Sequence, residues 1–212
     1  MAALDLQEQE QLDALKAWWK DNGTKLLGML LAATIAFGGW RGWQYYQHKQ
    51  SSDAVTLYAE FIKQLGSHDS KRVNDAAAAV MDKYASTPYA PRAALLAAQV
   101  NEQGQDAARA KTQLQWAVDH ASEAGLKDVA RLHLAALLLD EKNYAEALAL
   151  LEAGHQTSFD GLYADLKGDV LGAQGKLAEA RAAYQLAYEK TDAKSVYRNL
   201  IQMKLDAFGA AK

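Results

Sequence analysis

The segment LKGDVLGAQGKLAEARAAYQLAYE (residues 166–189) decides the fold, because its spacing of small and bulky residues occurs a second time in the chain. Residues 133–154, HLAALLLDEKNYAEALALLEAG, have the same order 33 positions earlier: small, bulky, turn, bulky, small, bulky, small. The matched positions are Gly168, Leu171, Gly175, Leu177, Ala180, Tyr184 and Ala187, and Ala135, Leu138, Lys142, Tyr144, Ala147, Leu151 and Gly154. Small residues are expected where two helices cross, because only Gly or Ala lets their backbones approach closely.

This pattern resembles the tetratricopeptide repeat, whose units are helix pairs of about 34 residues. A third, looser copy lies earlier in the chain at a spacing of 37, with Asn101 where a large apolar residue is expected. Its other positions are Ala98, Gln105, Ala107, Ala110, Leu114 and Ala117. Residues 52–85 predict one more helix pair, which is broken at residues 66–69.

The last helix is expected over residues 193–208 and would close the final pair. Its apolar residues are Val196, Leu200, Ile201, Met203 and Leu205, of which Val196, Leu200 and Met203 share one face. The sequence therefore predicts an all-α, tetratricopeptide-like solenoid of about four helix pairs plus a C-terminal capping helix. A non-repeating, alanine-rich bundle is the alternative. Abundant alanine and only two prolines favour helix in either case.

Ahead of the repeats, LLGMLLAATIAFGGW (Leu26–Trp40) is the one long uncharged apolar run. It is shorter than the roughly 20 residues that span a bilayer core, but its flanks extend it to residues 23–46 if Arg41 reaches the interface. Aromatic residues stand on both sides, as in the interfacial belts of membrane proteins: Trp18, Trp19, Trp40, Trp43, Tyr45 and Tyr46. We expect an uncleaved N-terminal transmembrane helix; a buried core helix and a cleaved signal peptide are the alternatives.

The lysines favour one orientation of this helix. Lys16, Lys20 and Lys25 precede the run, whereas Arg41 and Lys49 follow it. Because positive residues near a span tend to stay in the cytoplasm, residues 1–22 would be a cytoplasmic tail or amphipathic helix. In a bacterium, residues 47–212 would then form a periplasmic domain.

The residues that most enzymes and metal sites require are missing or scattered. The chain has no cysteine, and its five histidines form no HExxH motif and no pair four residues apart. The glycine-rich residues 168–176 lack the first glycine and the Ser/Thr of a phosphate loop, and no GxSxG motif occurs. A net charge of −3 without a basic stripe argues against nucleic-acid binding. We expect no catalytic residue, no cofactor and no metal.

Three blocks outside the repeats add a second resemblance: LKAWWKDNGTKLL (15–27), GWRGWQYYQ (39–47) and LIQMKLDAF (200–208). With them, nearly the full chain resembles the YfgM family of proteobacterial inner-membrane proteins, which are ancillary to the Sec translocon. The resemblance implies a single-span protein whose periplasmic domain associates with SecYEG and with the folding factor PpiD, and passes exported proteins to periplasmic chaperones. The alternative function is an envelope structural or cell-division coordinating protein.

Repeats of this kind bind partners on a concave face lined by the first helix of each pair. The expected groove residues are Leu95, Gln99, Leu132, Leu139, Asp140, Leu162, Asp165 and Asp169, with Arg92, Glu102, Val129, Ala136 and Ala173 beside them. This lining is apolar and acidic with almost no Lys or Arg. It suits an apolar segment with basic neighbours or a partner helix, and it does not suit a free C-terminal carboxylate. Alternatively, Leu132 and Leu139 pack against neighbouring helices.

The expected membrane helix carries a row of small residues. Gly28, Ala32 and Ala36 follow one another at four-residue intervals, and Gly38 and Gly42 form a GxxxG motif. Such a row lets a second membrane helix approach closely, so it predicts lateral packing with a partner. In an alanine-rich span the same row also arises by chance.

Overall fold

The structure, a computed structural model, describes the backbone of residues 2–67 and 69–209 and the side chains of residues 8–67 and 69–207. Within these residues the chain is all-α, as predicted, and contains no strand. The helices are α1 (Ala2–Leu65), α2 (Ser70–Lys83), α3 (Tyr89–Gln103), α4 (Ala107–His120), α5 (Ala124–Asp140), α6 (Tyr144–Glu152), the short 3₁₀ helix η1 (Thr157–Phe159), α7 (Asp160–Ala173), α8 (Leu177–Lys190) and α9 (Tyr197–Gly209). The chain divides into two units, Met1–Lys49 and Gln50–Lys212.

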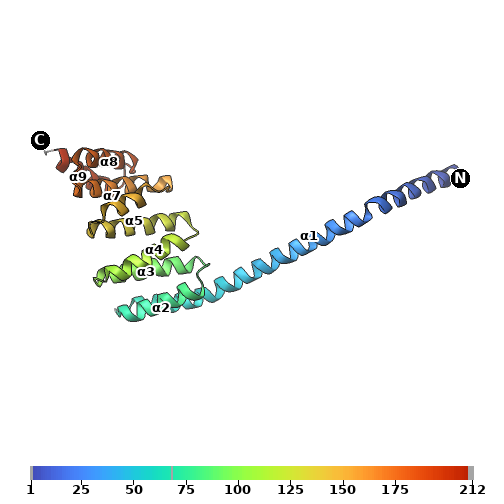
Figure 1. The fold of residues 1–212 in the computed structure, drawn as a ribbon, viewed down its shortest axis with the longest axis horizontal. Coiled ribbons are helices and arrows are strands. Elements are labelled where there is room, and N and C mark those ends of the chain that lie inside the picture. Colours follow the sequence, from blue (N-terminus) through green and yellow to red (C-terminus); the bar gives the residue numbers. More distant parts are fainter. Residues whose placement is uncertain (1, 68, 210–212) are drawn as a thin grey trace. The chain divides into compact units, whose positions relative to one another are not determined.

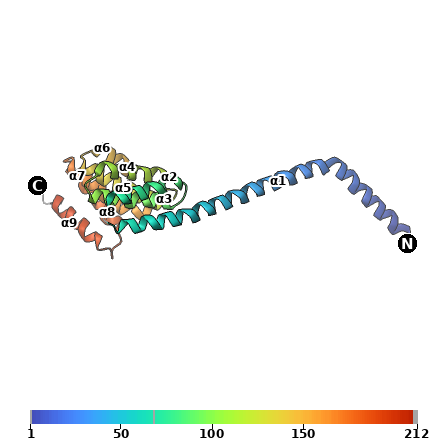
Figure 2. The same cartoon turned by 90° about the horizontal axis from the view of Figure 1, so that it is seen from below.

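The second unit is a stack of helix pairs (Figure 1). The end of α1, residues 50–65, packs with α2; α3 packs with α4, α5 with α6, and α7 with α8. Helix α9 packs against α8 and lies at the edge of the stack (Figure 2). Because α5 also contacts α3 and α7, the first helices of successive pairs lie next to one another. The prediction of four helix pairs with a capping helix is confirmed, including the break between α1 and α2.

The helices cross at the small residues of the repeat. Ala135 of α5 and Ala180 of α8 are completely buried, like the other alanines at these positions. Gly168 of α7 faces the ring of Tyr184, and a Cβ atom built on Gly168 would lie only 2.5 Å from Cε1 of that ring. One small position was placed wrongly: Gly154 lies beyond the end of α6 and is exposed, because this helix is shorter than α8.

Each turn between the two helices of a pair contains one residue in the left-handed conformation. Gln105 and Lys142 have a φ of 61°, and Gly175 has a φ of 77°. The residue after each of them donates its backbone N–H to a carbonyl five residues back, as in the Schellman motif; Asn143, for example, bonds Leu138 at 2.8 Å. These are the turn positions of the predicted repeat, and the structure confirms them.

We expect the substitution Lys142→Gly to raise the free energy of unfolding by about 0.5 to 1 kcal/mol, because glycine adopts a positive φ without the steric cost of a Cβ atom. Urea unfolding of the full chain in detergent, followed by circular dichroism, measures the change. Lys142→Ala is the matched control, since it removes the same charge but keeps the Cβ atom. An equal gain for both variants would contradict the conformational explanation.

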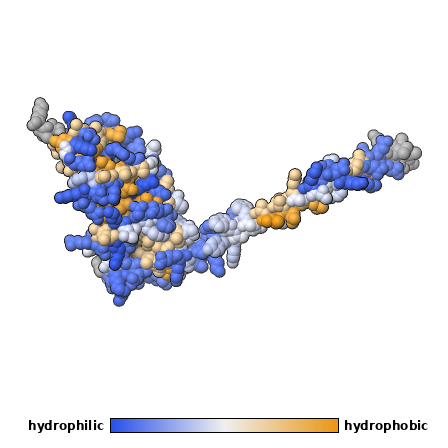
Figure 3. Space-filling model, in the orientation of Figure 1, coloured by the Kyte–Doolittle hydropathy of each residue, from blue (hydrophilic) through white to orange (hydrophobic). Residues whose placement is uncertain are grey.

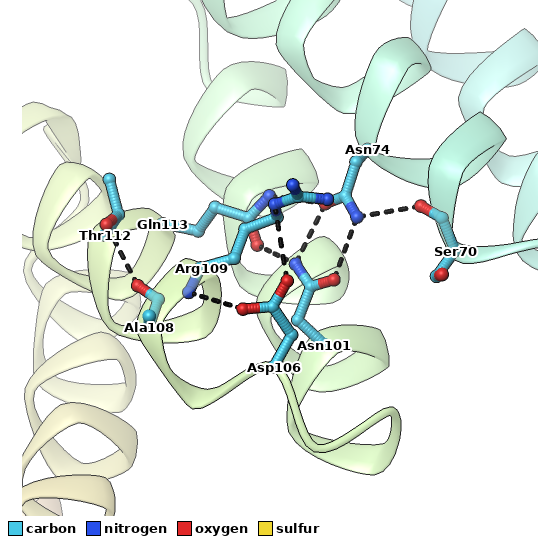
Figure 4. Close-up of polar contacts among 8 residues, drawn as sticks. All are labelled: Ser70, Asn74, Asn101, Asp106, Ala108, Arg109, Thr112 and Gln113. Carbon is cyan, nitrogen blue, oxygen red and sulfur yellow. Dashed lines mark hydrogen bonds and ion pairs between the residues drawn. The ribbon is translucent and has the colours of Figure 1, made fainter.

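A buried amide cluster explains why Asn101 departs from the apolar repeat pattern (Figure 4). The Asn101 side chain donates to Asn74 Oδ1 at 2.8 Å and to Gln113 Oε1 at 2.7 Å, and Gln113 donates to Asn74 Oδ1 at 2.8 Å. None of the three residues is more than 9% exposed. The cluster joins α2, α3 and α4, so polar contacts connect the first two pairs. The later pairs have leucine at the repeat position of Asn101.

The face of α9 that packs is not the expected one. Ile201 and Leu205 are buried in the core formed with α7 and α8. The predicted stripe is exposed instead: Val196 by 84%, Leu200 by 45% and Met203 by 67%. The helix also begins at Tyr197, later than expected, so Val196 precedes it.

Polar contacts decide which face of α9 packs. Tyr197 and Lys204 lie on the same side of the helix as Ile201, at spacings of four and three residues. Both donate hydrogen bonds to Asp165 of α7, and the Lys204 bond is 2.8 Å long. The apolar stripe alone therefore predicted the wrong side, because a buried acid needs these donors.

Within the first unit, residues 2–49 belong to α1, and this part of the helix exposes large apolar side chains all round. Leu27, Met29, Leu30, Leu31, Ile35 and Phe37 are between 58% and 70% exposed and form an apolar band along the helix (Figure 3). Among the described residues, α1 is the one helix long and apolar enough to cross a membrane, judged by length and composition. These features are consistent with a single N-terminal membrane span.

Candidate functional site: the concave face of the repeat domain

Three adjoining hollows open on the face formed by α3, α5 and α7, the first helices of three pairs. His133 of α5 is exposed and contributes to the lining of all three. We name them the apolar hollow, the acidic hollow and the C-terminal hollow. Together they follow the surface that the repeat pattern predicts as the concave face.

The apolar hollow has a volume of about 300 Å³ and lies between residues 50–65, α3 and α5. Its lining consists of Tyr58, Arg92, Leu95, Leu96, Gln99, Leu126, Val129 and His133. Burial raises the pKa of Tyr58, so this phenol stays neutral at physiological pH. The Arg92 guanidinium is held internally, because it donates to the Pro88 carbonyl at 2.6 Å and to Glu123 at 2.7 Å.

The acidic hollow, about 400 Å³, lies at the other end of α3 and α5. Its lining consists of Glu102, Gln105, Ala107, His133, Ala136, Leu137, Asp140 and Glu141. Glu141 forms an ion pair with Lys111 at 3.0 Å. Among the ion pairs of the described residues, none includes Glu102 or Asp140. The hollow therefore carries two carboxylates that the fold itself does not neutralise.

The C-terminal hollow, about 260 Å³, is formed by α5, α7 and α9. Its lining consists of Leu132, His133, Ala136, Leu162, Asp165, Leu166, Asp169, Tyr197 and Lys204. Here the expectation of almost no cations is wrong, because Lys204 of α9 lies 2.8 Å from both Asp165 and Asp169. Its charge is already paired with these two acids, so it is not free to hold a carboxylate of a ligand.

The acids of this hollow bind donors from two other helices. Tyr184 of α8 donates to Asp169 at 2.8 Å, and Tyr197 of α9 donates to Asp165. Burial, followed by these hydrogen bonds to carboxylates, raises the pKa of both tyrosines well above the usual range. Burial alone would lower the pKa of Lys204, but its hydrogen bonds and charge interactions with Asp165 and Asp169 outweigh that effect and raise it. The two tyrosines therefore stay neutral and Lys204 stays charged throughout physiological pH.

Seven of the eight predicted groove residues line a hollow. Leu95 and Gln99 lie in the apolar hollow, Asp140 in the acidic one, and Leu132, Leu162, Asp165 and Asp169 in the C-terminal one. Leu139 instead packs against the main core and lines none of them. Asp165 lines its hollow but is only 2% exposed, so its first role is in the fold. Whether this face binds a partner stays a prediction.

Sequence reasoning missed several lining residues, among them Tyr58, His133 and Lys204. His133 could have been found, because it follows the predicted Val129 by four residues on the same helix. Tyr58 and Lys204 belong to α1 and α9, whose sequences hold little of the repeat signature. Their contribution depends on how the terminal helices pack.

The described residues offer no group of three His, Asp or Glu side chains that could hold a metal ion. In the first unit, the predicted packing row is accessible: a Cβ atom built on Gly28, Gly38 or Gly42 would meet nothing within 4 Å. Ala32 and Ala36 are exposed as well. The row leaves room for a second helix, and its use stays a prediction.

Comparison with known proteins identifies a matching family and several similar proteins. Residues 16–210 match the family described as tetratricopeptide repeat-like domain. A protein of Neisseria gonorrhoeae named ancillary SecYEG translocon subunit is 31% identical over 97% of this chain and 99% of its own length. Proteins of the same name from Haemophilus influenzae and Escherichia coli are 25% and 27% identical, over 96% and 94% of this chain and 98% and 95% of their own lengths. No solved structure matches the chain.

Proposed function

Because the chain belongs to the family of ancillary SecYEG translocon subunits with a tetratricopeptide repeat-like domain, we propose that it is a membrane-anchored binding scaffold that works beside the SecYEG translocon. The single observation that carries this proposal is the hollowed concave face of the repeat domain, in a chain whose N-terminal helix exposes apolar side chains all round. A hollowed helical face suits the binding of a partner.

In this proposal residues 23–46 cross the bacterial inner membrane once, with residues 1–22 in the cytoplasm and residues 47–212 in the periplasm. The lysines before the span support this orientation. The row Gly28, Ala32, Ala36, Gly38 and Gly42 would contact a membrane helix of the translocon, with lipid around the remaining surface. The concave face would hold segments of exported proteins, which then pass to periplasmic chaperones, with the folding factor PpiD as a second membrane partner.

Site-specific photocrosslinking in living cells tests the proposal. A photoreactive residue in place of Met29, which is 70% exposed, probes the span, and one in place of the exposed Gln99 probes the apolar hollow. We expect SecYEG adducts from the first and adducts with PpiD or exported proteins from the second. Asp82 of α2 is exposed and lines none of the three hollows, so the same probe there is the control.

Two results would overturn the proposal. Adducts with division or cell-wall proteins and none with SecYEG would favour the alternative of an envelope structural or cell-division coordinator. A reporter fused after residue 212 that is active only in the cytoplasm would reverse the topology.

A further inference from the structure

The apolar and acidic hollows lie at opposite ends of one crease between α3 and α5, with His133 in the lining of both. Leu95 and Val129 mark the apolar end, and Glu102 and Asp140 mark the acidic end. At a rise of about 1.5 Å per residue, the two ends are about 10 Å apart along α3 and about 16 Å apart along α5. A ligand that lies in the crease therefore meets apolar side chains first and carboxylates one to two nanometres further on.

The two free carboxylates, those of Glu102 and Asp140, lie where a negative charge destabilises the fold. Glu102 lies in the last turn of α3, and Asp140 is the last residue of α5. A negative charge at a helix C-terminus is unfavourable, because it meets the negative end of the helix dipole. Neither carboxylate takes part in the hydrogen bonds or ion pairs of the described residues, whereas the adjacent Glu141 pairs with Lys111. Contacts within the fold therefore do not stabilise these two charges, whereas a cationic ligand would.

The cations that border the crease are already engaged within the chain. Arg92 binds Glu123 and the Pro88 carbonyl, and Lys111 binds Glu141. A ligand carboxylate would find no free positive partner here, whereas a Lys or Arg of the ligand would find Glu102 and Asp140. Charge complementarity therefore selects a basic ligand.

Between the two ends stand Gln99 and His133, two exposed side chains with hydrogen-bonding groups. An extended peptide has free backbone N–H and C=O groups that such side chains can bind, whereas the backbone of a helix is already paired internally. An extended chain advances about 3.3 Å per residue, so the distance between the ends corresponds to about three to five residues.

We infer that the crease between α3 and α5 binds an extended polypeptide segment in which an apolar residue is followed or preceded, about three to five residues away, by Lys or Arg. The apolar side chain occupies the apolar hollow, and the basic side chain lies between Glu102 and Asp140. The source of such segments, proteins in transit through the membrane, rests on the proposed function. The recognition itself is a property of this surface alone.

Binding of synthetic peptides to the full chain in detergent tests the inference. The probe is a fluorescent peptide with blocked ends, in which a Leu-Leu pair and a Lys are separated by Ser and Gly residues at the stated spacing. Replacing the Leu pair by Ser, or the Lys by Glu, should each weaken binding about tenfold or more, and moving the Lys next to the Leu pair should weaken it several-fold. Peptides with the two features in either order establish the direction.

The double variant Glu102→Gln and Asp140→Asn should weaken binding of the Lys peptide about fivefold to tenfold at low salt and remove most of its salt dependence. Its melting temperature should not fall, since both acids oppose their helix dipoles. Asp82→Asn with Glu189→Gln is the matched control, because it removes the same two kinds of charge outside the hollows and should leave the affinity unchanged.

Equal loss in both double variants would contradict the inference, because general charge and not the crease would then attract the peptide. Tighter binding of a preformed amphipathic helix than of the extended peptide would overturn it as well. These outcomes are separate from the crosslinking of the span: a chain that binds the peptide but gives no SecYEG adduct refutes the translocon role alone.

Discussion

The substitution Gly168→Ala is expected to destabilise the repeat domain by about 2 to 3 kcal/mol, although alanine is the better helix former. The added Cβ atom would lie 2.5 Å from the Tyr184 ring, closer than real carbon contacts allow. The ring has no easy escape, because Tyr184 is 2% exposed and its hydroxyl donates to Asp169 at 2.8 Å. The gain in helix propensity of about 1 kcal/mol does not offset the separation of α7 from α8.

Urea unfolding of the full chain in detergent measures this effect. Gly154→Ala is the control, since a Cβ atom there meets nothing within 4 Å and should change stability little. The double variant Gly168→Ala with Tyr184→Leu should lose less than the sum of the two single variants, because the shorter side chain relieves the contact. A neutral effect of Gly168→Ala would show that the two helices can separate without loss.

The second large effect is expected at the buried amide cluster. Asn101→Leu should cost about 2 to 4 kcal/mol, even though leucine matches the apolar position of the repeat, because it removes both hydrogen bonds to Asn74 and leaves the buried Gln113 Oε1 without its donor. Asn74 would keep its bond to the Ser70 carbonyl and the bond from Gln113, so part of the cluster survives. Thermal and urea unfolding of the full chain check the loss.

Replacing the whole cluster should recover much of this loss. In the triple variant Asn74→Leu, Asn101→Leu and Gln113→Met, no buried amide side chain remains unpaired, and apolar side chains of similar size fill the same space. The predicted loss of stability for Asn101→Leu is therefore opposite in sign to the gain that hydrophobicity alone would predict. If Asn101→Leu alone were stabilising, the amide bonds would contribute nothing that leucine cannot replace.

Much of this architecture could be predicted because tetratricopeptide-like packing depends on local spacing. Small residues recur where helices cross, and the turn positions Gln105, Lys142 and Gly175 recur where the chain needs a positive φ. Each of these requirements acts on one or two residues at a time, so it leaves a pattern in the sequence. The same reasoning placed seven of eight groove residues on a hollow, since one helix face follows from spacing alone.

The wrong predictions have one physical cause. Contacts with residues distant in the sequence determined which helix face is buried and which residue type is required, where local spacing allowed more than one answer. Val196, Leu200 and Met203 formed the apolar stripe expected of the last helix. The opposite face of α9 is buried instead, because the buried Asp165 accepts hydrogen bonds from Tyr197 and Lys204. Asn101 broke the apolar pattern because Asn74 and Gln113 approach it from two other helices.

By itself, then, the sequence determined the helix pairs, their turns, the apolar N-terminal helix and the face on which partners are expected. These follow from the periods of helix and repeat, which are short-range properties of the chain. Only the tertiary structure decided which acids remain free: Asp165 and Asp169 are neutralised by Lys204, while Glu102 and Asp140 are not. A charge is available to a partner only if no cation within the fold reaches it, and that depends on packing between elements far apart in the sequence.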